Sequence, residues 1–258
     1  MPTNFTPRDR YLLRIADTAL ILSQRNSEWC GHAPVLEEDL AQSNMALDWL
    51  GQARALLTHV GAAHGLDEDQ LAMHRLEHQF FNAVLAELPH APDGRQPGDF
   101  AFTVARNTAL SLWFTLLWER LLASSDAEVA AIAAKALKES RYHLQHSGDW
   151  LVRLGDGTAE SHNRLQAAIE RMGPLLPELF DDDEVDAAAE SLGLGPRWRD
   201  LQAPWRAQMD ALLARATLKA PADMPNAHGG RRGVHSEHLG HLLSELQYLQ
   251  RAYPGGVW

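Results

Sequence analysis

Apolar side chains recur at three- and four-residue intervals along most of the chain, which is the pattern of amphipathic helices. The first such segment covers residues 9–27 and ends before a turn at residues 31–34 that contains a glycine and a proline. A second helix is predicted over residues 36–60, with three acidic residues in its first turn, where the helix dipole favours negative charge. Two long helices joined by a short turn predict an antiparallel hairpin.

A second hairpin is predicted from residues 100–122 and 126–154, with a break and a helix cap at residues 124–126. Its first helix is the most apolar stretch of the chain, which is typical of a buried helix. Between the two hairpins we expect a helix over residues 67–88. A loop should follow over residues 89–99, which hold three prolines and two glycines.

Shorter helices are predicted in the remainder of the chain, over residues 162–171, 185–192, 197–218 with an interruption at Pro204, and 235–251. No segment shows the sustained alternation of apolar and polar residues that predicts a strand. The sequence therefore predicts an all-α protein with a single domain over residues 1–258. Its core would be two long antiparallel helix hairpins, at about 9–60 and 100–154, and a helical extension would cover about 158–258.

Composition narrows the function classes. The formal net charge of -11 argues against a nucleic-acid-binding surface, which needs clustered Lys and Arg. The single cysteine, Cys30, excludes internal disulfides, cysteine-based zinc sites and iron–sulfur clusters held by this chain alone. No apolar run approaches the roughly 18 residues that span a bilayer, and residues 1–10 lack the apolar core of a signal peptide. We therefore expect a cytoplasmic protein that binds neither nucleic acid nor membrane.

A bundle of two long hairpins raises the question of a di-iron or di-manganese carboxylate centre. Such a centre needs a Glu from each of two helices and a Glu-x-x-His motif from each of the other two. The chain contains one Glu-x-x-His, Glu87–His90, and Pro89 interrupts it at a helix end. The helix over residues 100–118 contains no Asp or Glu that would balance the charge of a metal pair. The ligand count therefore argues against a metal centre.

Two groups of histidines remain as candidates. His143 and His146 lie one helical turn apart, and we expect both to be hydrogen-bonded histidines rather than metal ligands. His238 and His241, close to His235, share a helix face in the last helix, and this spacing suits a zinc ion. Because leucines form a packing stripe along the same helix, we favour a surface role for this histidine cluster.

Several longer strings resemble a known family. They are SEWCGHAP at residues 27–34, LGQARAL at 50–56, KALKESRYH at 135–143, RLGDGT at 153–158 and ELQYLQRAY at 245–253. These strings resemble the C subunits of the bacterial phenylacetyl-CoA 1,2-epoxidases, which are multicomponent ring oxygenases. The resemblance runs from about residue 12 to the end of the chain. It implies a ferritin-like helix bundle.

The resemblance also implies partners and cofactors. In this family a homologous A subunit holds the di-iron centre and binds the CoA ester, and the C subunit is its non-catalytic structural partner. A small B subunit and a reductase subunit with flavin and an iron–sulfur cluster complete the system, which uses oxygen and NADPH. The resemblance thus implies a structural subunit with no cofactor and no catalytic residue of its own, acting in aerobic phenylacetate degradation.

Carried over to this sequence, the resemblance implies a degenerate metal site. The first Glu-x-x-His of the active relative falls on Trp49 and Gln52, and the second falls on Ser140 and His143. The carboxylate of the first helix would match Glu28. The architecture would therefore be kept while the metal was lost, with the apolar ring of Trp49 filling part of the space.

One alternative stays open, an oxidase or oxygenase in its own right with a di-metal site and atypical ligands. The ligands would then come from Asp17, Glu28, Asp48, Glu139 and His143. Because helices rise about 1.5 Å per residue, a straight hairpin that turns near residue 33 places Asp17, not Glu28, level with Trp49. The two hypotheses differ in whether this chain alone holds a metal pair.

Overall fold

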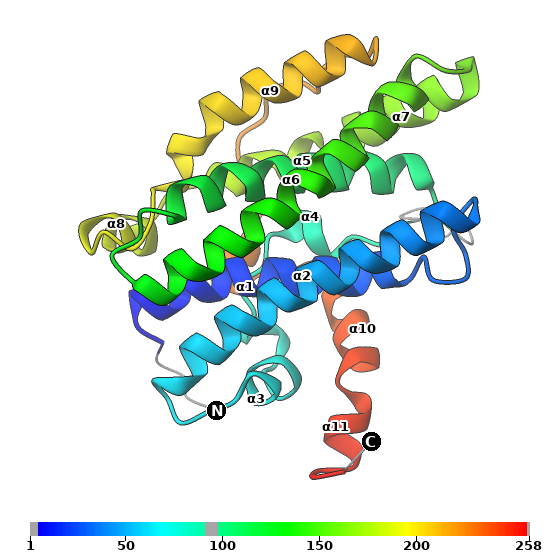
Figure 1. Ribbon diagram of the computed structural model, residues 1–258. Coiled ribbons are helices and arrows are strands. Elements are labelled where there is room, and N and C mark those ends of the chain that lie inside the picture. The colour runs from blue at the N-terminus through cyan, green and yellow to red at the C-terminus, as the bar shows by residue number, and fades with distance from the viewer. Residues whose placement is uncertain (1–4, 91–97, 257–258) are drawn as a thin grey trace.

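The computed structural model describes residues 5–90 and 98–256 (Figure 1). In these residues every regular element is helical, and the β geometry is limited to one isolated bridge between Gly229 and Val234. The all-α prediction is confirmed. Residues 91–97, which form most of the predicted loop at 89–99, lie outside the described residues.

The first predicted hairpin consists of α1 (Pro7–Ser27) and α2 (Leu36–Ala62). Thr6 caps α1, because its side chain accepts a hydrogen bond from the backbone N–H of Asp9 while the Asp9 carboxylate accepts one from the backbone N–H of Thr6. This capping box satisfies two backbone donors that the first turn leaves free. Both helices begin and end within about two residues of the prediction.

The second predicted hairpin consists of α5 (Phe100–Leu121) and α6 (Ala127–Gly155). Almost all of α5 is buried, in agreement with its apolar sequence. Asp126 caps α6 by accepting hydrogen bonds from two backbone N–H groups of its first turn. The two hairpins pack with α2 beside α6, so the four long helices form the core of the bundle (Figure 1).

The predicted helix over residues 67–88 is wrong. The segment consists of three short pieces, α3 (Glu68–Met73), the 3₁₀ turn η1 (Glu77–Gln79) and α4 (Val84–Glu87). The reason is tertiary: Arg75 and the backbone N–H of Phe81 both donate to the buried carboxylate of Asp17 in α1. These bonds hold the segment extended along α1 and replace the bonds of a continuous helix.

The remainder of the described chain forms the C-terminal extension. Its elements are α7 (Ala159–Met172), η2 (Gly173–Phe180), α8 (Glu184–Ser191), η3 (Trp198–Leu201), α9 (Gln202–Arg215), η4 (Gly230–Arg232), α10 (Glu237–Leu246) and α11 (Tyr248–Ala252). Helices α7 and α9 pack on the second hairpin, α8 packs on α1, and α10 and α11 extend away from the bundle on the opposite side (Figure 1).

The predicted interruption of a helix at Pro204 is wrong. Pro204 lies in the first turn of α9, where a proline removes no hydrogen bond because the first backbone N–H groups have no partner within the helix. The preceding residues form the separate turn η3. The predicted helix over residues 197–218 is therefore a 3₁₀ turn followed by α9.

Candidate functional site

Four of the five positions that the resemblance assigns to lost metal ligands lie where α2 packs on α6. Trp49 and Gln52 are three residues apart on α2, and Ser140 and His143 are three residues apart on α6, so each pair shares one helix face. Trp49, Ser140 and His143 are completely buried, and Gln52 is 3% exposed. We call these four residues the α2–α6 centre.

Direct contacts join the two helices at this centre. The rings of Trp49 and His143 lie 4.5 Å apart, centroid to centroid, with an angle of 57° between their planes. His143 Nε2 donates to Asp48 Oδ2 at 3.0 Å. Since a carboxylate only accepts, Nε2 is the donor in this bond. The prediction that His143 is a hydrogen-bonded histidine is confirmed.

Gln52, which the resemblance matches to the histidine of the first motif, also bonds across the helices. Its Nε2 donates to Glu139 Oε2 at 3.0 Å, and Glu139 lies 3.6 Å from the ammonium group of Lys135 one turn earlier. Asp48 and Glu139 therefore act as bridges between α2 and α6. Neither carboxylate occupies the buried centre, because their side chains are 37% and 18% exposed.

The donor atoms of the centre do not fit a metal pair. Four buried atoms there have no hydrogen-bond partner within the described chain: Trp49 Nε1, Gln52 Oε1, Ser140 Oγ and His143 Nδ1. This set offers one imidazole nitrogen and no carboxylate, whereas a di-iron centre needs carboxylates to balance its charge. In residues 5–90 and 98–256 no three His, Cys, Asp or Glu side chains are grouped so that they could hold a metal ion.

Glu28, the fifth of the degenerate positions, does not join the other four. It follows the last residue of α1, its side chain is 41% exposed, and it forms an ion pair with Arg25 at 2.5 Å. Asp17, the other candidate in the first helix, is bound by Arg75 and by the backbone N–H of Phe81. Neither carboxylate contacts the α2–α6 centre, so two of the five ligands of the alternative hypothesis lie apart from Asp48, Glu139 and His143.

The register of the helices explains the position of Glu28. Asn107 of α5 donates to both Asn26 of α1 and Gln42 of α2, so these two residues lie at one level of the bundle. Trp49 lies seven residues further along α2, or roughly 10 Å, and in the antiparallel α1 the matching position is near Ala19. Glu28 therefore lies nine residues, or roughly 13 Å, from the level of the centre, whereas Asp17 lies two residues from it and is bound by Arg75 and Phe81 instead.

A second polar contact between α2 and α6 was not recognised in the sequence. Glu38 accepts hydrogen bonds from His146 Nε2 at 3.0 Å and from Trp150 Nε1 at 2.7 Å. Burial raises the pKa of Glu38, but these two bonds outweigh burial and hold the pKa below its usual value. The prediction that His146 is hydrogen-bonded is confirmed. The spacing of residues 38, 42, 45, 49 and 52 along one face would have shown that Glu38 points inward.

The only Glu-x-x-His of the sequence is divided between two environments. Glu87 accepts from Asn82, from His235 Nδ1 and from the backbone N–H of Ser236. His90 instead contacts Trp29, Thr103 and the carbonyl of Arg25. The two side chains therefore form separate hydrogen-bond networks near the end of α1 and do not face a common ligand.

The C-terminal histidines are also divided. His235 precedes α10, and its imidazole is buried between Glu87 and the carbonyl oxygen of Phe80. Burial lowers the pKa of His235, but the hydrogen bond with Glu87 outweighs it and raises the pKa above its usual value. His241 is exposed on α10. His235 therefore has a local partner of its own and is not placed as a zinc ligand with the other two.

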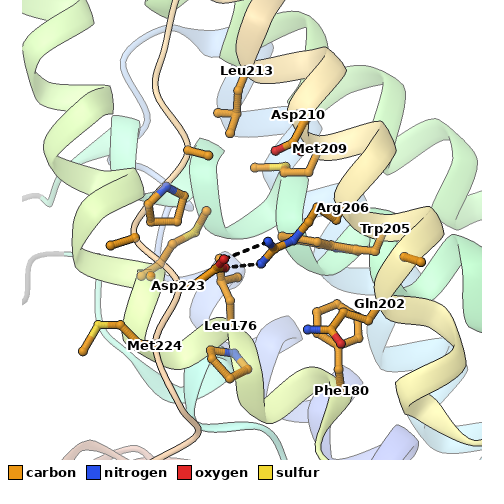
Figure 2. Close-up of a pocket in the computed structure, with 17 residues that line it drawn as sticks. Leu176, Phe180, Gln202, Trp205, Arg206, Met209, Asp210, Leu213, Asp223 and Met224 are labelled. Atoms are coloured by element: carbon orange, nitrogen blue, oxygen red, sulfur yellow. Dashed lines mark hydrogen bonds and ion pairs between the residues drawn. The ribbon is translucent and has the colours of Figure 1, made fainter.

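A separate cavity of about 660 Å³ lies between η2, α9 and the segment 220–224 (Figure 2). Its walls are mainly apolar, with Leu176, Phe180, Trp205 and Met209 among them. Arg206 and Asp223 face each other across it and form a two-point ion pair, and Asp210 is its third charged residue (Figure 2). This arrangement contains no nucleophile and no histidine, so it indicates apolar packing rather than a reaction.

No described helix combines the length and the apolar character that crossing a membrane requires.

Comparison with known proteins gives two matches. Residues 3–258 match the family model described as phenylacetic acid catabolic protein. The C subunit of the 1,2-phenylacetyl-CoA epoxidase of Escherichia coli is 47% identical over 249 residues, which cover 96% of this chain and 98% of that protein.

Proposed function

Because this chain belongs to the PaaA/PaaC family of phenylacetic acid catabolic proteins, we propose that it is the non-catalytic, structural C subunit of a phenylacetyl-CoA epoxidase. In this proposal it acts in the cytoplasm, in aerobic phenylacetate degradation. Its partners are the homologous A subunit, which holds the di-iron centre, and the B and reductase subunits of the same complex. Flavin, the iron–sulfur cluster and NADPH belong to the reductase subunit.

One observation carries the proposal. The α2–α6 centre consists of the positions that the resemblance assigns to metal ligands, and it is buried, but its interior donors are an indole, an amide, a hydroxyl and one imidazole nitrogen. The helix opposite, α5, contains a single acidic residue, Glu119, and that residue pairs with Arg141 at the surface. None of the four buried side chains of the centre is a carboxylate, and the buried carboxylate of Asp17 in α1 is bound by Arg75 and Phe81 instead, which supports a bundle that does no metal chemistry itself.

The role that fits such a bundle is support of a catalytic partner. Metal ligands on long helices hold their geometry only when neighbouring elements fix those helices in place. A second bundle packed against the ligand helices of the A subunit would supply that constraint. Direct hydrogen bonds tie α2 to α6 in this chain, so its four-helix core is suited to act as a rigid template.

Elemental analysis tests the proposal. The chain is purified alone and together with its A subunit, and iron is measured per chain alongside oxygen- and NADPH-dependent epoxidation with the reductase present. We expect no stoichiometric iron and no turnover from the chain alone, and iron at the stoichiometry of the A subunit in the pair. Two irons per chain with turnover in the absence of the A subunit would show that this chain is itself an oxygenase.

A further inference from the structure

The outer surface of α2 and α6 carries exposed apolar side chains that the fold does not use. On α2, Leu36, Leu40, Leu47 and Leu50 are 71%, 57%, 64% and 38% exposed, and Tyr142 on α6 is 52% exposed. We call this surface the α2–α6 face. The elements that pack most closely on α2 are α1, α3 and α6, and α7 and α9 pack on α6 (Figure 1). A row of exposed leucines on one helix is typical of a surface that another helix covers.

Gly51 lies in the middle of this face and gives a second, independent observation. A glycine in a helix interior is destabilising by about 1 kcal/mol relative to alanine, so it usually has a local packing reason. A Cβ added at Gly51 meets no atom within 4 Å, whereas one added at Gly61 or Gly155 would collide with a backbone carbonyl of this chain. The chain alone therefore gives no reason for glycine at position 51. The close approach of a partner's backbone at this position would explain the glycine, because only glycine has no side chain in the way.

The size of the face suits a stable protein interface. Helix α2 has 27 residues and α6 has 29, so each is about 40 Å long and roughly 10 Å wide. Together they offer on the order of 800 Å², which is the area that each partner buries in a standard interface. The two helices that carry the face are held together by the hydrogen bonds Asp48–His143 and Gln52–Glu139.

The charges on the face indicate what kind of partner it fits. Asp48 and Arg54 on α2 and Lys135 and Glu139 on α6 flank the apolar side chains, so both signs are interspersed. A nucleic acid or an anionic membrane surface would need a basic patch. Leucines at helical spacing around a glycine instead fit an apolar stripe on a partner helix, and a protein built on the same long-helix bundle provides one.

We propose that the α2–α6 face docks a long helix of the A subunit, with Gly51 at the point where the two helix backbones cross. The inference rests on the proposed function, since the occupant is the homologous catalytic subunit. In this arrangement the degenerate centre lies directly behind the interface. The hydrogen bonds that replace the metal then stiffen the surface on which the partner's helices rest.

Two variants test the face on the intact pair of subunits. Gly51→Leu keeps an apolar surface and adds a side chain whose Cβ meets no atom within 4 Å, and Leu47→Glu places a charge among the leucines. The control is Leu192→Glu, because Leu192 is 56% exposed on a different side, at the end of α8. Thermal melting of each chain alone and the Kd for the A subunit are both measured.

We expect Gly51→Leu to melt above wild type when alone and yet to bind the A subunit at least tenfold more weakly. Leu47→Glu should fold normally and lose binding to a similar degree, and Leu192→Glu should bind as wild type does.

Normal A-subunit binding by both face variants would overturn the docking surface while leaving the structural-subunit function intact. If the variants abolish a self-dimer and leave A binding unchanged, the occupant is a second copy and the inference is wrong. Failure of wild type to bind the A subunit, with iron in this chain alone, would overturn both proposals.

Discussion

At the scale of single residues, buried polar side chains here are fixed by specific partners. His90 is 4% exposed; its Nε2 donates to the carbonyl of Arg25, and its Nδ1 accepts from Trp29 Nε1 at 3.0 Å and from the Thr103 hydroxyl. Burial lowers the pKa of His90 well below its usual value, and the guanidinium of Arg106 lowers it further. The fold therefore keeps this imidazole neutral.

The neutral state of His90 predicts a pH dependence of stability. Below pH 6.5 the unfolded chain takes up a proton on this imidazole and the folded chain does not, so the free energy of unfolding falls as the pH falls towards the lowered pKa. One proton accounts for at most about 1.4 kcal/mol per pH unit. We expect His90→Gln to be less stable than wild type at about pH 7.5 and to lose less stability between about pH 7.5 and 5.5. Urea unfolding at both pH values measures this, and parallel losses in the two proteins would contradict it.

At the scale of elements, caps and side-chain bridges decide where helices begin and how they join. Asp126 caps α6, and its other carboxylate oxygen accepts hydrogen bonds from Arg8 at 2.5 Å and His59 at 2.9 Å. Burial raises the pKa of Asp126, but these bonds outweigh it and keep the pKa well below its usual value. One side chain thus starts α6 and also ties it to the ends of α1 and α2.

Substitutions at Asp126 separate the two roles. We expect Asp126→Ala to lower the free energy of unfolding by about 2 kcal/mol, because the cap and the bridge are both lost. Asp126→Asn keeps a capping oxygen and should cost less than the alanine variant. Glu128→Ala removes an exposed acidic residue of the same turn and should cost little. Urea unfolding ranks the three; equal stability of the alanine and asparagine variants would show that the cap contributes nothing.

At the scale of the whole molecule, a buried ion network attaches the C-terminal extension to the bundle. Arg14 of α1 donates to Asp183 at 2.9 Å and to Asp186 of α8 at 3.1 Å. Arg231 of η4 donates to the same Asp186 carboxylate at 2.9 Å. Arg14 and Asp186 are completely buried, so the two guanidinium groups depend on this carboxylate for their charge balance.

We expect Asp186→Asn to destabilise the protein by about 3–5 kcal/mol, because it leaves two buried cations with one remaining carboxylate nearby. The C-terminal extension should also become easier to cleave in limited proteolysis, since α8 and η4 would lose their anchor on α1. Asp223→Asn, which removes an exposed ion pair with Arg206, is the matched control and should leave both readouts unchanged. Wild-type stability of Asp186→Asn would show that packing alone holds the extension.

Hydrophobic spacing and helix-breaking residues were enough to define the four long helices. The apolar faces of α1, α2, α5 and α6 each repeat over five turns or more, and such a repeat depends only on the helical period. The segment at residues 67–88 was misread because its propensity is helical, while Arg75 and Phe81 bond to Asp17, which lies more than fifty residues earlier in the chain. No local pattern records a partner at that distance.

The resemblance to the epoxidase C subunits, carried over to this sequence, assigned the pairs Trp49/Gln52 and Ser140/His143 and implied that the motif glutamates are missing. Their three-residue spacing then places both members of each pair on one helix face. Only the tertiary structure decided which carboxylates lie near the α2–α6 centre. The register of α1 against α2 and α5 places Glu28 away from the centre, the bonds with Arg75 and Phe81 hold the carboxylate of Asp17, and side-chain packing makes Asp48 and Glu139 bridges between helices. Register and packing are set by contacts between residues far apart in the chain, and the order of residues along one helix does not contain them.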